Sequence, residues 1–455
     1  MTIDADEKPR ATGMGEEPVA GLSARFTALE ASLHQLSGSR SDRALRYWVP
    51  GRIEVLGKHT DYAGGRSLLC AVKRGICMLA VPRDDNHFRI LDARSMELAE
   101  YEIGPELAGQ VGHWSNYPAT VARRIARDFP TLVSPRGADM VFESNIPLAS
   151  GMSSSSALVV ASFLALSDAN ELSTLPEFTR DMGDDARLAG YLGAVENGWS
   201  YGALAGDSGV GTFGGSEDHT AILCARPGAL VQYSFCPVRL EREVALPAGY
   251  SFAVGVSGVR AQKTGAARER YNRASRATSL IADIWRRDTQ RADPTLAAAI
   301  TSSSAAPGRL RDILRGSAPD DTAFTASELL ARLEHFITES EEIVPEAAES
   351  LARGRLSDFG ALVDRSQERA ERLLGNQIDQ TVDLARTARE LGAAAASAFG
   401  AGFGGSVWAL VRSEDAEEFL HRWEERHRKK YPDSETAGRG VFFATSAGPA
   451  AMRIQ

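Results

Sequence analysis

The sequence predicts an α+β protein with two domains, and three observations support this: its length, its composition and a change of texture near residue 245. The chain has 455 residues, which is enough for two or three domains of ordinary size. Hydrophobic residues make up 43% and charged residues 24%, values typical of a packed globular protein. Short strand-like segments dominate before residue 245 and long charged helical segments after it. We therefore expect one domain over 23–243 and a second over 244–455.

The first half alternates strand-like runs with two helices. The runs are rich in β-branched and aromatic residues and are separated by Gly, Asp and Asn turns: RYWVPGRIEVLG, SLLCAVKRGICMLAVP, FRILDA, DMVFES, TAILCA and LVQYSF. The segment 155–169 contains no Gly or Pro and predicts a buried helix, and apolar positions at helical spacing predict another over 182–198.

The second half begins with a strand, SFAVGVSG, and continues with long helical segments. These segments are AARERYNRASRATSLIADIWRR, ASELLARLEHFITESEEI and DFGALVDRSQERAERLLG. The small-residue stretch AAAITSSSAAPG between them predicts a surface loop. The last part predicts a strand, a helix and a strand, in GSVWALV, EDAEEFLHRWEERHRKKY and GVFFATSAG.

Charge and cysteine content argue against several kinds of partner. The net charge of −9 disfavours nucleic acid or an anionic membrane as the main partner. The longest apolar run, 157–166, is about half of the ~20 residues that span a bilayer. The four cysteines lie in or beside apolar runs without a C-x-x-C pair, which predicts reduced residues of a cytoplasmic protein. Residues 1–22 contain acids where a signal peptide needs a basic start, so we expect a disordered tail.

A small-residue loop, NIPLASGMSSSSALVV at 145–160, runs directly into the predicted helix. Free backbone N–H groups and the positive helix end converge there, which is a common way to bind phosphate oxygens. The alternative is that the serines only cap the helix. Because no GxxxxGKS or GxxxxGKT pattern occurs, a nucleotide site here is not of the P-loop type.

A glycine cluster, GAGFGGSVWALV at 400–411, satisfies the GxGxxG pattern. A dinucleotide site requires a strand before that pattern and a helix after it, whereas a strand follows here. The dinucleotide interpretation is therefore disfavoured.

Together with PGRIEVLGKHTDYAGG at 50–65, these two clusters resemble the three signature motifs of the GHMP kinase superfamily. The first is similar to the galactokinase motif PGRVNLIGEHTDYNGG, the second to PLGGGLSSSASL and the third to GGGFGGC. Weaker matches, in the right order, extend the resemblance over about 45–450. It implies a ribosomal-protein-S5-like N-terminal domain and a ferredoxin-like C-terminal domain with extra helices, with an active site between them.

The resemblance implies an ATP- and Mg²⁺-dependent kinase that phosphorylates the anomeric hydroxyl of a monosaccharide. Asp218, in GSEDHTAIL, matches the catalytic aspartate, and Arg52 matches the arginine beside it. Mg²⁺ is expected on Ser155, with Ser154 as a second candidate, and on Glu196. The expected contacts of the triphosphate are Ala149, Ser150, Gly151, Met152, Ser153, Ser154 and Ser155, with Gly402, Gly404 and Gly405 allowing close approach.

On the sugar side, the resemblance assigns contacts to His59, Asp61, Tyr271 and Gly215. Carboxylates that accept hydrogen bonds from hydroxyls discriminate strongly, because an analogue without the hydroxyl leaves a buried acceptor unpaired. The sequence does not reveal the oligomeric state, so monomer and dimer both remain open.

Lys58 departs from the family pattern, which has glutamate before His-Thr-Asp. Glu217 and His219, on either side of Asp218, also depart from GIMDQ. Two substrates remain open: D-galactose, with Lys58 in solvent or paired with Glu217, or an acidic sugar such as a uronic acid whose carboxylate Lys58 binds. A sugar and ATP sensor without turnover is the third possibility.

Overall fold

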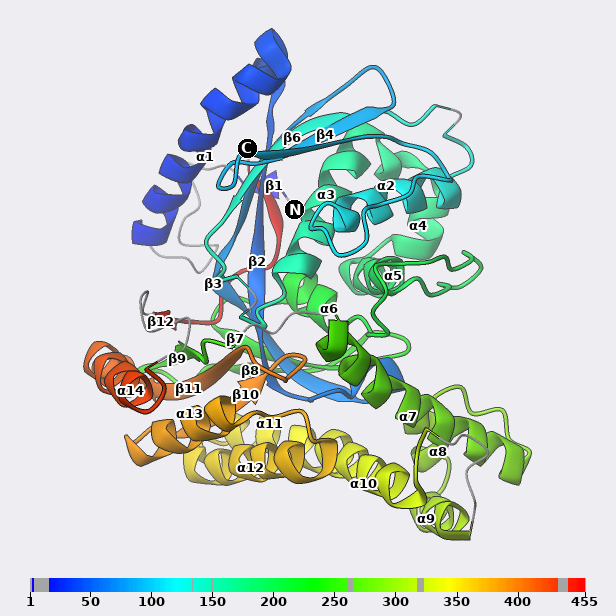
Figure 1. The fold of residues 1–455 in the computed structure, drawn as a ribbon, viewed down its shortest axis with the longest axis vertical. Coiled ribbons are helices and arrows are strands. Elements are labelled where there is room, and N and C mark those ends of the chain that lie inside the picture. Colours follow the sequence, from blue (N-terminus) through cyan, green and yellow to red (C-terminus); the bar gives the residue numbers. More distant parts are fainter. Residues whose placement is uncertain are drawn as a thin grey trace.

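The computed structural model describes residues 2–3, 16–132, 134–148, 150–259, 265–316, 323–432 and 441–454. It contains two mixed α/β units, each built on its own sheet (Figure 1). The two-domain α+β fold predicted from the sequence is confirmed.

The first unit is built on a nine-stranded sheet in the order β1-β13-β2-β3-β6-β4-β5, with β7 paired to β3 and β8 to β7. Its strands are β1 (Thr2–Ile3), β2 (Leu45–Leu56), β3 (Arg66–Pro82), β4 (His87–Asp92), β5 (Glu97–Glu102), β6 (Ala138–Ser144), β7 (Ala229–Ser234), β8 (Arg239–Ala245) and β13 (Met452–Ile454). Strands β2 and β3 form its centre. They are buried over nearly their whole length because helices cover both faces.

Helix α1 lies on one face of this sheet and the other helices of the unit lie on the opposite face (Figure 1). The helices are α1 (Glu16–Ser37), α2 (Asn116–Asp128), α3 (Ser154–Ala169), α4 (Pro176–Met182), α5 (Asp185–Asn197) and α6 (Glu217–Cys224). Helix α3 is apolar on all sides and almost entirely buried, as a helix between a sheet and other helices must be. The short helices η1 (Gly38–Arg43), η2 (Asp61–Ala63) and η3 (Leu172–Thr174) complete the unit.

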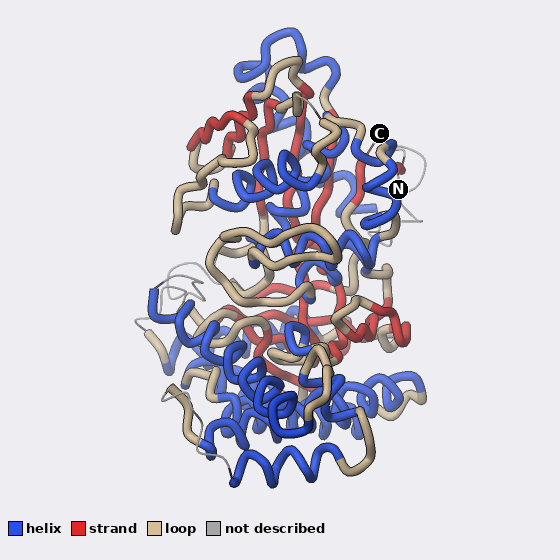
Figure 2. Tube along the Cα trace, turned by 90° about the vertical axis from the view of Figure 1, so that its right-hand side faces the viewer, coloured by secondary structure: helices blue, strands red, loops and turns tan. Residues whose placement is uncertain are grey.

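The second unit has the β-α-β-β-α-β order of a ferredoxin-like fold. Its antiparallel sheet has the order β10-β11-β9-β12, with β9 (Tyr250–Val256), β10 (Ala395–Phe399), β11 (Ser406–Arg412) and β12 (Phe442–Thr445). Its helices are α7 (Gly265–Thr289), α8 (Leu296–Thr301), α9 (Ala306–Gly316), α10 (Ala326–Ile337), α11 (Val344–Ala352), α12 (Leu356–Arg369), α13 (Asp379–Glu390) and α14 (Ala416–Lys430), with π-helical turns η4 (Thr338–Ile343) and η5 (Ala370–Leu374). Figure 2 shows most of these helices gathered at the end of the molecule away from both termini.

The chain finally returns to the first unit. Strand β13 pairs antiparallel with β2, with Met452 opposite Trp48. The Gly448 amide donates to Ala71 O and the Ala451 amide donates to Ile222 O. The residues after β12 therefore pack on the first unit, although the predicted boundary at 243/244 assigns them to the second.

Three local expectations differ from the structure. TAILCA, predicted as a strand, lies in helix α6, where the acids Glu217 and Asp218 occupy the first turn and favour a helix start. AAAITSSSAAPG, predicted as a loop, contains most of α8 and the start of α9, because Leu296 and Ile300 are buried in a separate core of the helical region. Helix α1 begins at Glu16, so the end of the predicted 1–22 tail is helical. None of the described helices is both long enough and apolar enough to cross a membrane.

Candidate active site

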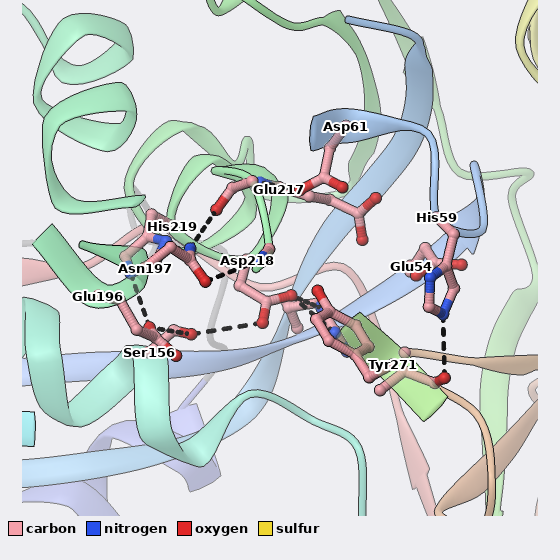
Figure 3. Close-up of a pocket in the computed structure, with 15 residues that line it drawn as sticks. Glu54, His59, Asp61, Ser156, Glu196, Asn197, Glu217, Asp218, His219 and Tyr271 are labelled. Atoms are coloured by element: carbon pink, nitrogen blue, oxygen red, sulfur yellow. Dashed lines mark hydrogen bonds and ion pairs between the residues drawn. The ribbon is translucent and has the colours of Figure 1, made fainter. Parts of the chain in front are cut away.

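Two neighbouring cavities meet at Arg52, Asp218 and Ala401. The larger one has a volume of about 350 Å³ and combines an apolar end, which includes Trp114 and Tyr117, with the serine-rich loop. The smaller one, about 40 Å³, is lined mainly by polar side chains (Figure 3). One cavity thus offers an aromatic surface and a phosphate loop, and the other offers hydrogen-bonding groups.

The serine-rich loop presents unused polar groups at the start of helix α3. Ser153, at the N-cap position, adopts a left-handed conformation (φ 58°), and its side chain makes no capping hydrogen bond. Its Oγ is buried and has no hydrogen-bond partner among the described residues. The capping interpretation is therefore wrong for Ser153, whereas binding of phosphate oxygens would use this geometry.

Both units hold this loop in place. The amide of Arg52 donates to Met152 O at 3.3 Å, and Ser406 Oγ, from the second unit, donates to Ser150 O at 2.7 Å. Gly151 also lies in the left-handed region (φ 74°). Five loop residues line the larger cavity, namely Gly151, Met152, Ser153, Ser154 and Ser155. Of the other two predicted contacts, Ser150 lines neither cavity and Ala149 lies outside the described residues.

Asp218 and Arg52 form a close ion pair where the cavities meet. Arg52 Nε lies 2.8 Å and Nη2 2.7 Å from Asp218 Oδ1. The guanidinium also donates to Gly151 O in the phosphate loop. Burial lowers the pKa of Arg52, but the carboxylates of Asp218 and its neighbours raise it by more, so the net effect is a raised pKa. Because Arg52 is only 4% exposed, its charge acts with little screening by water and favours an ionised Asp218.

Ser156, one residue beyond the predicted magnesium serines, joins Asp218 to Glu196. Its Oγ donates to Glu196 Oε2 at 2.8 Å and to Asp218 Oδ2 at 3.3 Å. His219 Nε2 lies 3.0 Å from Glu196 Oε2. The predicted serines Ser154 and Ser155 line the larger cavity instead. In Figure 3, Asp218 lies between Ser156 and Glu196 on one side and His59 and Glu54 on the other.

Oxygen donors at this junction fit a magnesium ion. Glu196 and Asp218 supply carboxylates and the loop supplies hydroxyls, which are the hard ligands that Mg²⁺ prefers. No cluster of three His, Cys, Asp or Glu side chains suited to a metal occurs in the part of the chain that the structure describes. Few protein ligands are expected for a Mg²⁺ ion that is held largely by nucleotide phosphates.

The predicted sugar contacts, apart from Lys58, lie together in the smaller cavity. His59 Nδ1 is 2.9 Å from Tyr62 Oη, and Nε2 is 3.0 Å from Ala401 O. Asp61 Oδ2 accepts a hydrogen bond from the Glu217 amide at 3.1 Å. The ring of Tyr271 lies 5.1 Å from that of His59. Gly215 also lines this cavity, three positions before Asp218.

Lys58 lies elsewhere. It is completely buried, lines neither cavity, and donates from Nζ to Ser366 Oγ at 3.0 Å. Ser366 Oγ in turn donates to Glu339 Oε1 at 2.9 Å, and Glu339 Oε1 also accepts the Gly57 amide at 2.8 Å. The expectation that Lys58 points to solvent is therefore wrong. Its ammonium group donates to Ser366, whereas the two alternatives expected it to pair with Glu217 or to bind a sugar carboxylate.

The third motif shapes the loop that reaches both cavities. Gly400, Gly402, Gly404 and Gly405 all have positive φ, which other residues rarely adopt. A Cβ on Gly400 would lie 2.9 Å from Gly151 O, so this glycine allows the two loops to approach. Among these loop residues, Ala401 lines both cavities and Gly400 lines the smaller one, whereas the predicted Gly402, Gly404 and Gly405 line neither.

Several residues that line the smaller cavity were not predicted as site residues, among them Glu54, Ser156, Asn197 and His219. Glu54 is 3% exposed, and burial raises its pKa to about 7 despite nearby Lys58 and Arg52. The sequence did contain an indication that Glu54 is unusual, since the galactokinase motif has asparagine where this chain has Glu54. Burial, with help from Glu54 and Asp61, also raises the pKa of Glu217 well above its ordinary value.

Family comparisons agree with these motifs. Residues 116–198 match the family described as GHMP kinases N terminal domain, and 347–429 match GHMP kinases C terminal. Residues 38–82 match the galactokinase galactose-binding signature.

Known proteins similar to this chain include two bacterial galactokinases. That of Chloroflexus aggregans is 28% identical over 399 residues, covering 87% of this chain and 90% of the relative. That of Chloroflexus aurantiacus is 28% identical over 425 residues, covering 91% and 97%. The solved structure of Lactococcus lactis galactokinase complexed with galactose aligns with a TM-score of 0.74 at 20% identity, covering 94% of this chain and 99% of that one. The chain therefore belongs to the GHMP kinase superfamily, in its galactokinase-like branch.

Proposed function

We propose that this protein transfers the γ-phosphoryl group of ATP to the anomeric (C1) hydroxyl of galactose or a closely related monosaccharide. The observation that carries this proposal is the Arg52–Asp218 pair at the meeting point of two cavities. The larger cavity suits a nucleotide because it combines aromatic side chains with a phosphate loop, and the smaller one suits a sugar. The galactokinase relatives support the choice of galactose.

In this proposal, Asp218 accepts the proton of the sugar hydroxyl as the hydroxyl oxygen attacks the γ-phosphorus. The bond between the γ-phosphorus and the β–γ bridging oxygen breaks, and ADP leaves. Arg52 keeps Asp218 ionised and stabilises the negative charge of the phosphoryl group during transfer. His59, Asp61 and Tyr271 orient the sugar.

On the nucleotide side, the amides and hydroxyls of 150–155 bind the phosphates. Ser155 and Glu196, with Ser156 nearby, hold Mg²⁺. The ion, when bound, neutralises phosphate charge. Since the reaction consumes ATP and the four cysteines are free thiols, we also infer a cytoplasmic location.

The test is ATP consumption that depends on an added sugar, with Mg²⁺ present. We expect turnover with D-galactose in the wild type. Asp218→Asn should lower kcat by about 10²- to 10⁴-fold, the usual contribution of a general base, while ATP still binds. Near-normal activity of this variant would assign the base to Glu217 instead. ATP binding without turnover of any sugar would make the protein a sensor.

A further inference from the structure

The smaller cavity is strongly acidic. Five of its lining side chains are carboxylic acids, namely Glu54, Asp61, Glu196, Glu217 and Asp218, whereas Arg52 is its one guanidinium. The roles proposed above use Asp61, Glu196 and Asp218. They assign no function to Glu54 and Glu217, although burying two further carboxyl groups costs folding free energy.

Glu54 and Glu217 contact each other across two elements, since Glu54 lies on β2 and Glu217 at the start of α6. Their carboxyl groups lie within hydrogen-bonding reach of one another, so the two side chains interact as a pair. Glu217 Oε2 also accepts a hydrogen bond from Ser67 Oγ at 2.6 Å. Glu54 Oε1, by contrast, is buried and has no hydrogen-bond partner among the described residues.

We propose that Glu54 binds the acceptor sugar directly through Oε1, and that the neighbouring carboxyl group of Glu217 positions it. An unpaired buried carboxylate oxygen is costly, and a hydrogen-bond donor on the ligand removes that cost. Glu54 lines the same cavity as His59, Asp61 and Tyr271. A sugar bound by these residues therefore presents its hydroxyl groups to Glu54 as hydrogen-bond donors. This inference rests on the proposed function, because it assumes that the smaller cavity holds the acceptor.

The same observations define the class of sugar. Lys58, the cation expected to attract a carboxylate, is bound to Ser366 outside the cavity. A sugar carboxylate would therefore meet several carboxyl groups and compete with phosphate for Arg52, which costs free energy in a buried site. An ammonium group in place of a hydroxyl would be attracted by these acids. The acceptor is thus a neutral sugar or an amino sugar, and uronic acids are excluded.

The first experiment compares three sugars with the wild-type protein, by turnover and by calorimetric binding: D-galactose, D-galactosamine and D-galacturonic acid. We expect kcat/KM for galactosamine within about tenfold of galactose, and for galacturonic acid at least about 10³-fold lower, because only the acid meets like charges. Similar efficiencies for galacturonic acid and galactose would overturn the inferred sugar class. This series needs no variant, so it decides the point even if substitutions impair folding.

The second experiment uses Glu54→Gln and Glu217→Gln. Glu54→Gln should raise KM and the calorimetric Kd for galactose about tenfold, as expected for loss of one charged hydrogen bond, with kcat nearly unchanged. Glu217→Gln should have a smaller effect in the same direction. The matched control is Glu143→Gln on β6, a part-buried carboxylate paired with Arg25 outside both cavities. An unchanged galactose KM and Kd in Glu54→Gln would refute a direct contact.

The two proposals fail differently. If the wild type binds galactose with a Kd that Glu54→Gln weakens, but phosphorylates none of the three sugars, the proposed kinase function fails and the contact of Glu54 stands. If the wild type phosphorylates galactose and Glu54→Gln does so with the same KM, the kinase function stands and the contact fails.

Discussion

Replacement of Lys58 by methionine should destabilise the protein without removing a substrate contact. Methionine keeps most of the apolar length of the side chain but loses the ammonium that bonds to Ser366. Beyond Ser366 lies Glu339, which is fully buried and has one carboxylate oxygen, Oε2, without a partner among the described residues. The substitution therefore leaves a buried negative charge without its cation.

The magnitude follows from these contacts. One hydrogen bond from a charged donor contributes about 1.5–3 kcal/mol, and breaking a buried ion pair typically costs about 3–5 kcal/mol. Since Lys58 reaches Glu339 through Ser366, we expect the lower end of the second range, about 3 kcal/mol. Lys58→Glu, which restores the residue of the family motif, should be worse because its carboxylate would lie near Glu339 and Glu54.

The assay is urea unfolding combined with galactose KM. Adding Glu339→Gln to Lys58→Met should recover part of the lost stability, because the uncompensated carboxylate is then removed. Arg315→Met, which breaks an ion pair with Asp312 at the protein surface, is the control and should leave the unfolding midpoint unchanged. An unfolding free energy within about 0.5 kcal/mol of the wild type, together with a large rise in galactose KM, would refute the reasoning and restore Lys58 as a sugar ligand.

Three further changes test the sugar side. Gly215→Ala would place Cβ 2.7 Å from Asp61 Cγ, so displacement of that carboxylate should raise galactose KM about 10- to 100-fold while ATP KM stays constant. Arg332→Met removes a hydrogen bond to His59 O, and should raise galactose KM about tenfold at unchanged ATP affinity. Glu54, whose pKa rises from 4.5 to about 7 in the folded protein, keeps its proton to higher pH than the unfolded chain, so stability falls as pH rises through this window. Glu54→Gln should flatten that fall in urea titrations at several pH values; an equally steep fall would contradict the assignment.

Contiguous motifs made much of the site predictable. Arg52, His59 and Asp61 lie within one short segment, and the turn geometry of that segment brings them to the cavity without reference to the rest of the chain. The hydrogen-bond partner of the Lys58 side chain could not be predicted in this way. It depends on Ser366, which lies 308 positions further along the chain in a helix whose placement requires the whole second unit.

Short apolar runs were the other source of error. TAILCA has too few residues for periodicity to distinguish a strand from a helix. Its helical state follows from the two acids before it and from packing against α5 and β2. Glu54 was missed for a related reason: a carboxyl group in a buried strand does not by itself reveal that it faces a cavity lined by other acids.

The return of β13 to β2 has a consequence for how the protein is made. During translation, β2 emerges from the ribosome early and finds its partner β3 at once, but its other edge stays open until β13 has been synthesised. An open edge strand is a template for pairing with other chains, so the nascent protein carries an aggregation-prone edge through most of its synthesis. Chaperones that protect such edges during elongation are therefore expected to matter more for the yield of this protein than those that act on the finished chain.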